Sequence, residues 1–228
     1  TVDTAKISAE AQRTSALQEF ESVSYTLTGD QANPTLEWWP KEKDYGPNYL
    51  KFDLGLYASE SGDLGFVIYG KHTRTWLNSL GAEWRNEVQL GYFNNLSTSF
   101  YQPLDVAQRF FVEPRLFATR SWEDVFVDNE RLARYKCSDR GGNFDAGVNL
   151  SDDAQIRVGY LYTRRDTSVE TGSPILPETK RDDAGLTMAA TYDSRDTAFN
   201  PTRGVAAALE YSYVEDSLGA DLDWERLE

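Results

Sequence analysis

The chain has 228 residues, a length typical of one large domain or of one domain with a small addition. Its 23 Lys and Arg against 37 Asp and Glu give a net charge of −14, which argues against a nucleic-acid binder, since that class needs a basic face. Hydrophobic residues make up 40% of the chain, too many for disorder, and the single cysteine, Cys137, excludes an internal disulfide framework. The longest apolar run, residues 66–69, is too short for a membrane helix; a membrane β-barrel stays compatible, because its strands average out polar.

The first 44 residues predict a small α+β unit. Residues 4–19 are rich in helix-forming residues, and Phe20 to Thr28 then alternates apolar and polar side chains as a strand does. A turn at residues 29–34 leads to a second strand, from Thr35 to Pro40. Such a unit is too short to hold a core alone, and residues 41–47 predict a linker.

From residue 49 to 228 the pattern changes to repeated alternation over runs of about 8–11 residues, the length of a strand that crosses a bilayer. We expect about eleven strands, near residues 50, 65, 83, 97, 110, 123, 131, 143, 155, 184 and 204, and a possible twelfth that ends at Glu228. The polar segment from Arg165 to Asp182 predicts an extracellular loop.

Such strands fit either a soluble sandwich or an outer-membrane barrel with its apolar side chains in lipid. Long runs, short turns and charged polar faces favour the barrel. Aromatic residues near the run ends also favour it, as interfacial girdles: Tyr57, Trp76, Tyr101, Trp122, Tyr135, Tyr162, Tyr192 and Tyr213. The predicted fold class is therefore all-β: an antiparallel transmembrane β-barrel, incomplete and larger than this segment, with a small α+β piece before it.

One turn carries a family resemblance. Its segment runs Tyr-Asp-Ser-Arg-Asp-Thr-Ala-Phe-Asn-Pro-Thr-Arg-Gly from residue 192 to 204 and resembles the signature turn of the BamA/TamA-like bacterial surface antigen superfamily, which joins two late barrel strands. Asp and Asn stabilise tight turns, and Pro fixes φ. The signature residues are Tyr192, Asp193, Arg195, Asp196, Pro201 and Gly204.

The N-terminal unit resembles the last half of a POTRA domain. Segments 45–52, 74–87 and 100–104 are similar to one branch more narrowly, the patatin-like phospholipases fused to a POTRA and an outer-membrane barrel, a type V secretion variant. The resemblance implies residues 1–44 as a POTRA half in the periplasm and 49–228 as a barrel cut before its last strands. The family's lid-loop Arg-Gly-Phe/Tyr motif and a terminal aromatic strand are missing from these residues.

The resemblance implies an anchor or translocator with no catalytic, cofactor-binding or metal-binding residues of its own. A lipid acyl hydrolase would lie before Thr1, because these residues contain no Gly-x-Ser-x-Gly elbow. The expected partners are membrane lipid and a protein that pairs with strand Phe20 to Thr28; a homo-oligomer is also compatible, and no nucleic acid is expected. The alternatives are a barrel of an assembly or two-partner secretion transporter, and a soluble β-sandwich binding module.

Other candidate residues favour structural roles. His72 is the only histidine, so a catalytic triad is not available. For Asp193 and Asp196 a turn held by an ion pair is favoured over a carboxylate site, and the acids at 221, 223 and 225 lack the loop of a calcium site. We expect Trp38 and Trp39 to pack a small core or rest on the membrane interface. The charges of Lys51, Arg85, Glu87 and Arg157 fit either a tuned pore or fixed ion pairs in a closed lumen.

Overall fold

The computed structural model describes residue 7 and residues 20–29, 34–42, 47–58, 64–128, 130–173, 175–195 and 201–228. The chain divides into two units, Thr1–Tyr49 and Leu50–Glu228, and each is described by itself. Among the described residues, no helix has the length and apolar character needed to cross a bilayer.

The first unit contains an antiparallel hairpin of β1 (Phe20–Thr28) and β2 (Thr35–Glu42). Tyr25 lies opposite Trp38 in this register, and their ring centroids are 5.9 Å apart. Trp39 points to the other face and is more exposed than Trp38. The helix predicted for residues 4–19 lies outside the described residues, apart from Ile7.

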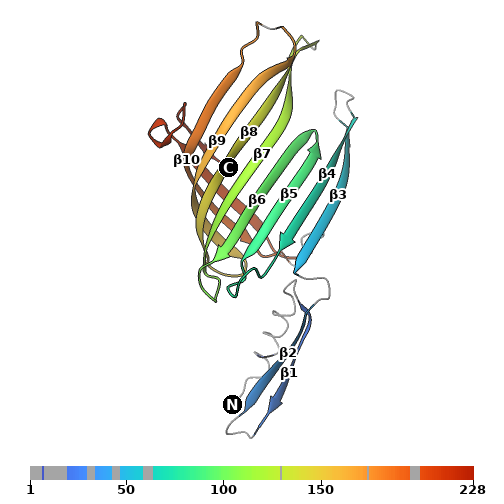
Figure 1. The fold of residues 1–228 in the computed structure, drawn as a ribbon, viewed down its shortest axis with the longest axis vertical. Coiled ribbons are helices and arrows are strands. Elements are labelled where there is room, and N and C mark those ends of the chain that lie inside the picture. Colours follow the sequence, from blue (N-terminus) through green and yellow to red (C-terminus); the bar gives the residue numbers. More distant parts are fainter. Residues whose placement is uncertain are drawn as a thin grey trace. The chain divides into compact units, whose positions relative to one another are not determined.

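The second unit is built on one ten-stranded antiparallel sheet in which every strand pairs with its neighbours in sequence (Figure 1). The strands are β3 (Asn48–Ala58), β4 (Leu64–Arg74), β5 (Glu83–Gly91), β6 (Phe93–Pro103), β7 (Phe110–Val127), β8 (Glu130–Asn149), β9 (Ala154–Thr171), β10 (Thr179–Asp193), β11 (Ala206–Val214) and β12 (Trp224–Leu227), with a short 3-10 helix, η1 (Asp216–Leu218), before β12. Among the described residues the sheet is not closed, and β3 and β12 form its two edges.

Two predicted boundaries are wrong because strand pairing continues through them. The candidates near 110 and 123 are one strand, β7, and those near 131 and 143 are one strand, β8; the two pair over their whole length with one irregularity, between Val125 and Phe126. The segment predicted as a loop, Arg165 to Asp182, is mostly strand, since β9 and β10 pair as far as Thr167 and Thr179. Their polar side chains made these extensions resemble a loop.

The strands alternate between two faces of opposite character. The outer face, defined by the side chains in register with Leu116, carries exposed apolar residues: Leu116 is 66% exposed and Phe144 is 53% exposed. The inner face, in register with Glu113, buries acids: Glu113 and Asp145 are each 7% exposed. This arrangement is the reverse of a soluble protein, and it is what a sheet with one face in lipid requires.

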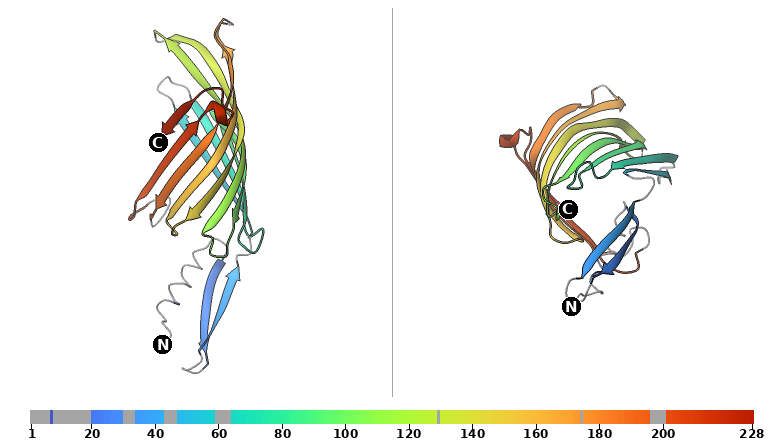
Figure 2. Two further views of the ribbon diagram at one scale, coloured as in Figure 1. Left: turned by 90° about the vertical axis from the view of Figure 1, so that its left-hand side faces the viewer. Right: turned by 60° about the horizontal axis from the view of Figure 1, so that its bottom comes forward.

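The sheet curves into a wall, as Figure 2 shows. Glu113 on β7 contacts arginines on both β5 and β9, each two strands away, about 10 Å at the usual strand spacing. Such convergence across two strand spacings is favoured on a concave surface and agrees with the inner face being the concave one in Figure 2. We call the end of the sheet where β3 begins the proximal end and the opposite end the distal end.

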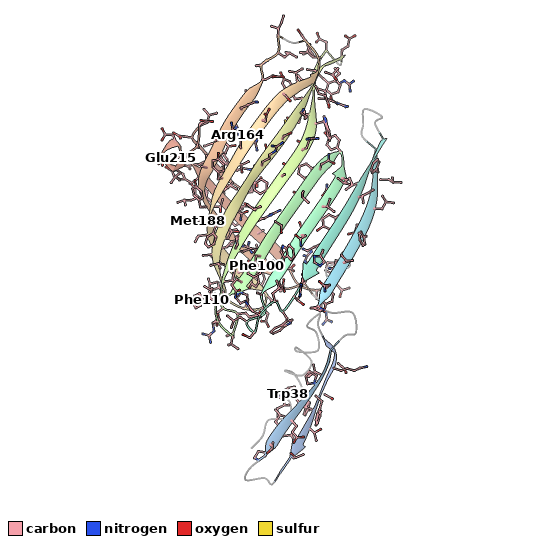
Figure 3. The ribbon with its side chains drawn as sticks, in the orientation of Figure 1. Trp38, Phe100, Phe110, Arg164, Met188 and Glu215 are labelled. Atoms are coloured by element: carbon pink, nitrogen blue, oxygen red, sulfur yellow. The ribbon has the colours of Figure 1, made fainter. Side chains whose placement is uncertain are left out.

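The structure contradicts the sandwich alternative. Within residues 50–228, the described strands form a single sheet, and no second sheet covers the apolar outer side chains. Met188 and Phe110 lie among those outer side chains, while Arg164 lies farther toward the distal end (Figure 3).

Candidate functional site: the charged inner face

A carboxylate on β7 lies at the centre of the inner face. Glu113 lies 3.4 Å from Arg85 on β5 through one oxygen and 3.4 Å from Arg157 on β9 through the other. Arg157 also lies 3.3 Å from Asp145 on β8, and Arg85 lies 2.7 Å from Glu83. Alternating charges therefore link β5, β7, β8 and β9 across the concave surface.

Two aromatic rings support these arginines. The guanidinium carbon of Arg85 lies 4.9 Å from the ring centroid of Tyr101, and that of Arg157 lies 5.4 Å from the ring centroid of Phe111. The two rings contact each other at 4.9 Å between centroids. The two distances from guanidinium to ring are within the range of cation–π attraction. The rings and the carboxylates therefore both hold the arginines in place.

Glycines opposite the bulky side chains make room for this cluster. A Cβ at Gly147 would lie 2.2 Å from the ring of Phe111, and a Cβ at Gly159 would lie 2.0 Å from Oδ1 of Asp145. Each glycine is the register partner of the residue it accommodates. The close packing of the network therefore depends on the absence of a side chain at these two positions.

A second polar cluster lies nearer the distal end. Arg165 on β9 donates from Nε and Nη2 to the two carboxylate oxygens of Asp139 on β8, at 3.0 and 2.9 Å. On β10, Arg181 Nε lies 3.4 Å from Oδ2 of Asp183, a residue only 3% exposed. The indole Nε1 of Trp224 on β12 donates to Oδ1 of Asp183 at 3.3 Å, which joins the last strand to the inner face.

This arrangement supplies a polar lining held together by ion pairs. Its carboxylates face arginines and an indole N–H. Arg85, Glu87 and Arg157 are all in ion pairs, with Glu87 3.0 Å from Lys71. Among the described residues, no group of His, Cys, Asp and Glu has the arrangement to hold a metal ion.

The signature turn joins β10 to β11 at the proximal end. Arg195 donates from Nε and Nη2 to the carboxylate of Asp193 at 2.9 and 2.7 Å, and its backbone N–H donates to the same carboxylate at 3.1 Å. These two interactions, the side-chain one first, lower the pKa of Asp193 from its ordinary 3.8 to about 2. The turn lies beyond the apolar rows of the outer face.

The glycine of this turn has a steric role. Gly204 has a φ of +95°, and a Cβ there would lie 2.2 Å from the carbonyl oxygen of Ser194, whose N–H donates to Val205 O at 3.0 Å. Tyr192 is exposed on the outer face and Pro201 is exposed in the turn. Asp196 lies outside the described residues.

The comparisons with known proteins agree with this geometry. A match to the Omp85 superfamily domain covers residues 78–226, more than half of the chain. The chain belongs to the Omp85 superfamily. The search of curated proteins found no match.

The Omp85 fold is also seen in a solved structure, the crystal structure of BamA from Haemophilus ducreyi lacking POTRA domains 1–3. The TM-score is 0.68 at 16% identity, over 99% of this chain and 44% of that one. The chain therefore spans less than half the length of that structure. Its Omp85 membership supports the predicted outer-membrane location and barrel-type sheet.

Several residues that the sequence singled out have other surroundings in this Omp85 sheet. Tyr101, predicted in an interfacial girdle, lies on the inner face against Phe111, because it is in register with Glu83. His72 lies on the outer face, where Asn86 Nδ2 is 3.2 Å from its Nδ1 and Trp84 packs edge-on. Cys137 is half-buried on β8, with Thr167 Oγ1 4.0 Å from its sulfur.

The acids near the C-terminal end hold a loop. Asp221 accepts a hydrogen bond from the backbone N–H of Asp182 at 2.6 Å, and Asp223 accepts one from that of Asp216 at 2.8 Å. The central residue Glu113 was not predicted as functional. The sequence signal for Glu113 was weak. It consisted of an acid that alternates with apolar residues in one strand and of glycines in the next two strands.

Proposed function

We propose that this sheet is part of the wall of an outer-membrane barrel that anchors a polypeptide at the outer membrane and helps to deliver it. The observation that supports this proposal is the reversal of burial between the two faces, with leucines exposed outside and acids buried inside. A lipid-facing wall with a rigid charged lining can hold water and polar chain segments, which a solid apolar core cannot.

The open edges of the sheet fit a larger barrel. Unpaired backbone groups at a sheet edge have no hydrogen-bond partners in hydrocarbon. In the membrane, β3 and β12 would therefore pair with further strands, from the same protein or from a partner. This proposal also agrees with the share of the BamA structure that the chain covers.

Within this class we propose a fusion to a patatin-like phospholipase, as the anchor and deliverer of a lipid acyl hydrolase. The support is the resemblance of residues 45–52, 74–87 and 100–104 to that branch. The hairpin of β1 and β2 would belong to a POTRA domain in the periplasm, and its strand Phe20–Thr28 would pair with a partner chain by edge addition.

The second candidate is a barrel of an outer-membrane protein assembly or secretion machine without a lipase. The Omp85 match and the BamA likeness favour it. The full-length reading frame discriminates the two: a Gly-x-Ser-x-Gly elbow supports the fusion, and tandem POTRA repeats support the machine.

The test uses the full-length protein in its own cells. We expect it in the outer-membrane fraction, with heat-modifiable mobility on gels; recovery from the aqueous phase as a monomer without detergent would contradict the barrel. Phospholipid hydrolysis by that fraction, lost when the elbow serine is replaced, supports the fusion. A general fall in outer-membrane protein levels on depletion, with no hydrolysis, supports the machine.

A further inference from the structure

The outer face changes from apolar to charged within two neighbouring register rows on four neighbouring strands, and each strand contributes one cation. The row of Leu116, Gly142, Tyr162 and Ala184 is the last apolar one toward the distal end. The next row holds Ala118, Arg140, Arg164 and Asp182, and the one after it holds Arg120, Ser138, Asp166 and Lys180. An alignment of this kind marks one level along the barrel wall.

The depth of this level fits the edge of the hydrocarbon. On β7 the outer side chains from Phe110 to Ala118 are apolar, and nine strand residues extend about 27 Å. A strand tilt of about 40° reduces this to about 21 Å along the membrane normal, close to the height of about 25 Å of the apolar band in outer-membrane barrels. The cations therefore lie at headgroup level in the distal leaflet.

Cations concentrate in a surface hollow at this level. The hollow has a volume of about 370 Å³ and is lined by five basic and two acidic side chains, in a chain whose net charge is −14: Arg120, Lys136, Arg140, Arg164, Asp166, Glu178 and Lys180, with Ser138 and Ser168.

Only part of this positive charge is neutralised. Lys180 lies 3.2 Å from Asp166, and Arg164 lies 4.0 Å from Asp182. Arg120, Lys136 and Arg140 make no ion pair with any described residue. Three cations that line one hollow, each without an ion pair to a described acid, fit an anion with several acceptor oxygens.

An apolar hollow of about 330 Å³ continues from the basic one and shares Arg120, Ser138 and Arg140 with it. Its outer-face lining includes Val88, Leu90, Leu96 and Ala118. The hollow exists because the hairpin of β5 and β6 turns at Gly91 and Tyr92, while β7 and β8 continue past it. The two hollows form one groove, basic at one part and apolar at the other.

We propose that this groove binds a single phosphorylated, acylated lipid of the distal leaflet. Its phosphate would bind Arg120, Lys136 and Arg140, and one acyl chain would lie along Leu96 and Val88. Arginine suits the planar, multidentate recognition of phosphate oxygens. A free anion would use only the basic part, whereas a lipid accounts for both parts and for their position at the edge of the apolar band.

This inference rests on the sheet being in an outer membrane, and its test separates the two. The full-length protein is purified in a zwitterionic detergent, and its folded state is checked by heat-modifiable mobility. Diphosphoryl lipid A, its monophosphoryl derivative, phosphatidylcholine and inorganic phosphate are then titrated, with bound species counted by native mass spectrometry.

For the wild-type protein we expect one retained diphosphoryl lipid, weaker retention of the monophosphoryl form and no competition by millimolar inorganic phosphate. The double variant R120Q/R140Q removes two charge-assisted contacts and should lower the affinity about ten- to a hundredfold. The matched control R74Q/R109Q removes two arginines at the proximal end and should leave the affinity within about twofold.

Equal loss in both variants would overturn the site, since it would indicate general charge attraction. Displacement by inorganic phosphate would overturn the lipid as the source. If the protein bound another protein in place of the lipid, and R120Q abolished that binding, the lipid assignment would also be overturned. A protein that shows no heat-modifiable folding in wild-type form would instead contradict the proposed barrel itself.

Discussion

Gly147 lies directly opposite Phe111 in the pairing of β7 and β8, so close that a Cβ on the glycine would be 2.2 Å from Cζ of the ring. Phe111 is 1% exposed and contacts Tyr101 and Arg157, so it has no free space to move into. This one contact connects the strand register, the aromatic pair and the charged network of the inner face.

We therefore expect Gly147→Ala to lower the free energy of unfolding of the full-length protein by about 1–3 kcal/mol, the usual cost of overpacking. Urea titration of the protein refolded in vesicles measures it. Gly55→Ala is the matched control on β3, because its nearest neighbour would be 3.9 Å away. Adding Phe111→Leu should recover part of the lost unfolding free energy, because the smaller side chain makes room for the new methyl group. If the effects of the two substitutions on the unfolding free energy simply added, the explanation would be contradicted.

The carboxylate of Glu113, which pairs with two arginines, predicts a difference in stability between two charge-neutralising variants. Glu113→Gln leaves Arg85 and Arg157 without their common anion on a buried part of the inner face, and we expect a loss of about 1–3 kcal/mol of unfolding free energy. Glu87→Gln breaks the more exposed pair with Lys71 and should cost less than about 1 kcal/mol. Equal effects of the two variants would show that the Glu113 network adds no more than a surface pair.

The orientation of the outer face can be tested by depth. Val158 and Ser168 lie on the same strand and the same face, the first within the apolar band and the second beyond that band, in register with Lys136. Val158→Arg should cost about 2–4 kcal/mol of folding free energy in vesicles, and Ser168→Arg about 0–1 kcal/mol, as arginine costs most at the bilayer midplane. Similar small values for both would place this face in water.

The signature turn predicts a pH dependence with a definite sign. The pKa of Asp193 is lowered to about 2 from an ordinary 3.8, so the contribution of its pair with Arg195 is fully present above pH 4. It is lost as the pH falls from 4 through 2, because protonation removes the anion. The measurement is the unfolding rate as a function of pH. In the Asp193→Asn variant the change between pH 4 and pH 2 that is due to this pair should be absent. A wild-type and a variant curve that stay parallel from pH 5 to pH 2 would contradict it.

Much of the sheet follows from local alternation. The strands near residues 50, 65, 83, 97, 155 and 184 were all predictable, because a period of two is a property of each segment alone. The continuity of β7 and β8 was not, since the pattern divided each of them into two shorter strands, near 110 and 123 and near 131 and 143. Pairing between the strands, which a linear pattern does not contain, makes them continuous.

The inner-face site was predictable only in part. Arg85 and Arg157 were identified as charges of the polar face, but their common partner was not. Glu113 is 28 residues from the one and 44 from the other, so the contact depends on the sum of several turn lengths and registers. Tyr101 shows the same limit, because its position near a strand end suited a girdle while its register turned it inward.

The amino-acid sequence by itself determined which side chains share a face, since alternation is imposed by the backbone of each strand. It also determined that the apolar face is long enough to match a bilayer. Only the tertiary structure decided that the charged side chains converge and that cations from four strands lie within two neighbouring register rows. Curvature and register set these distances, and both arise from pairing among all the strands together.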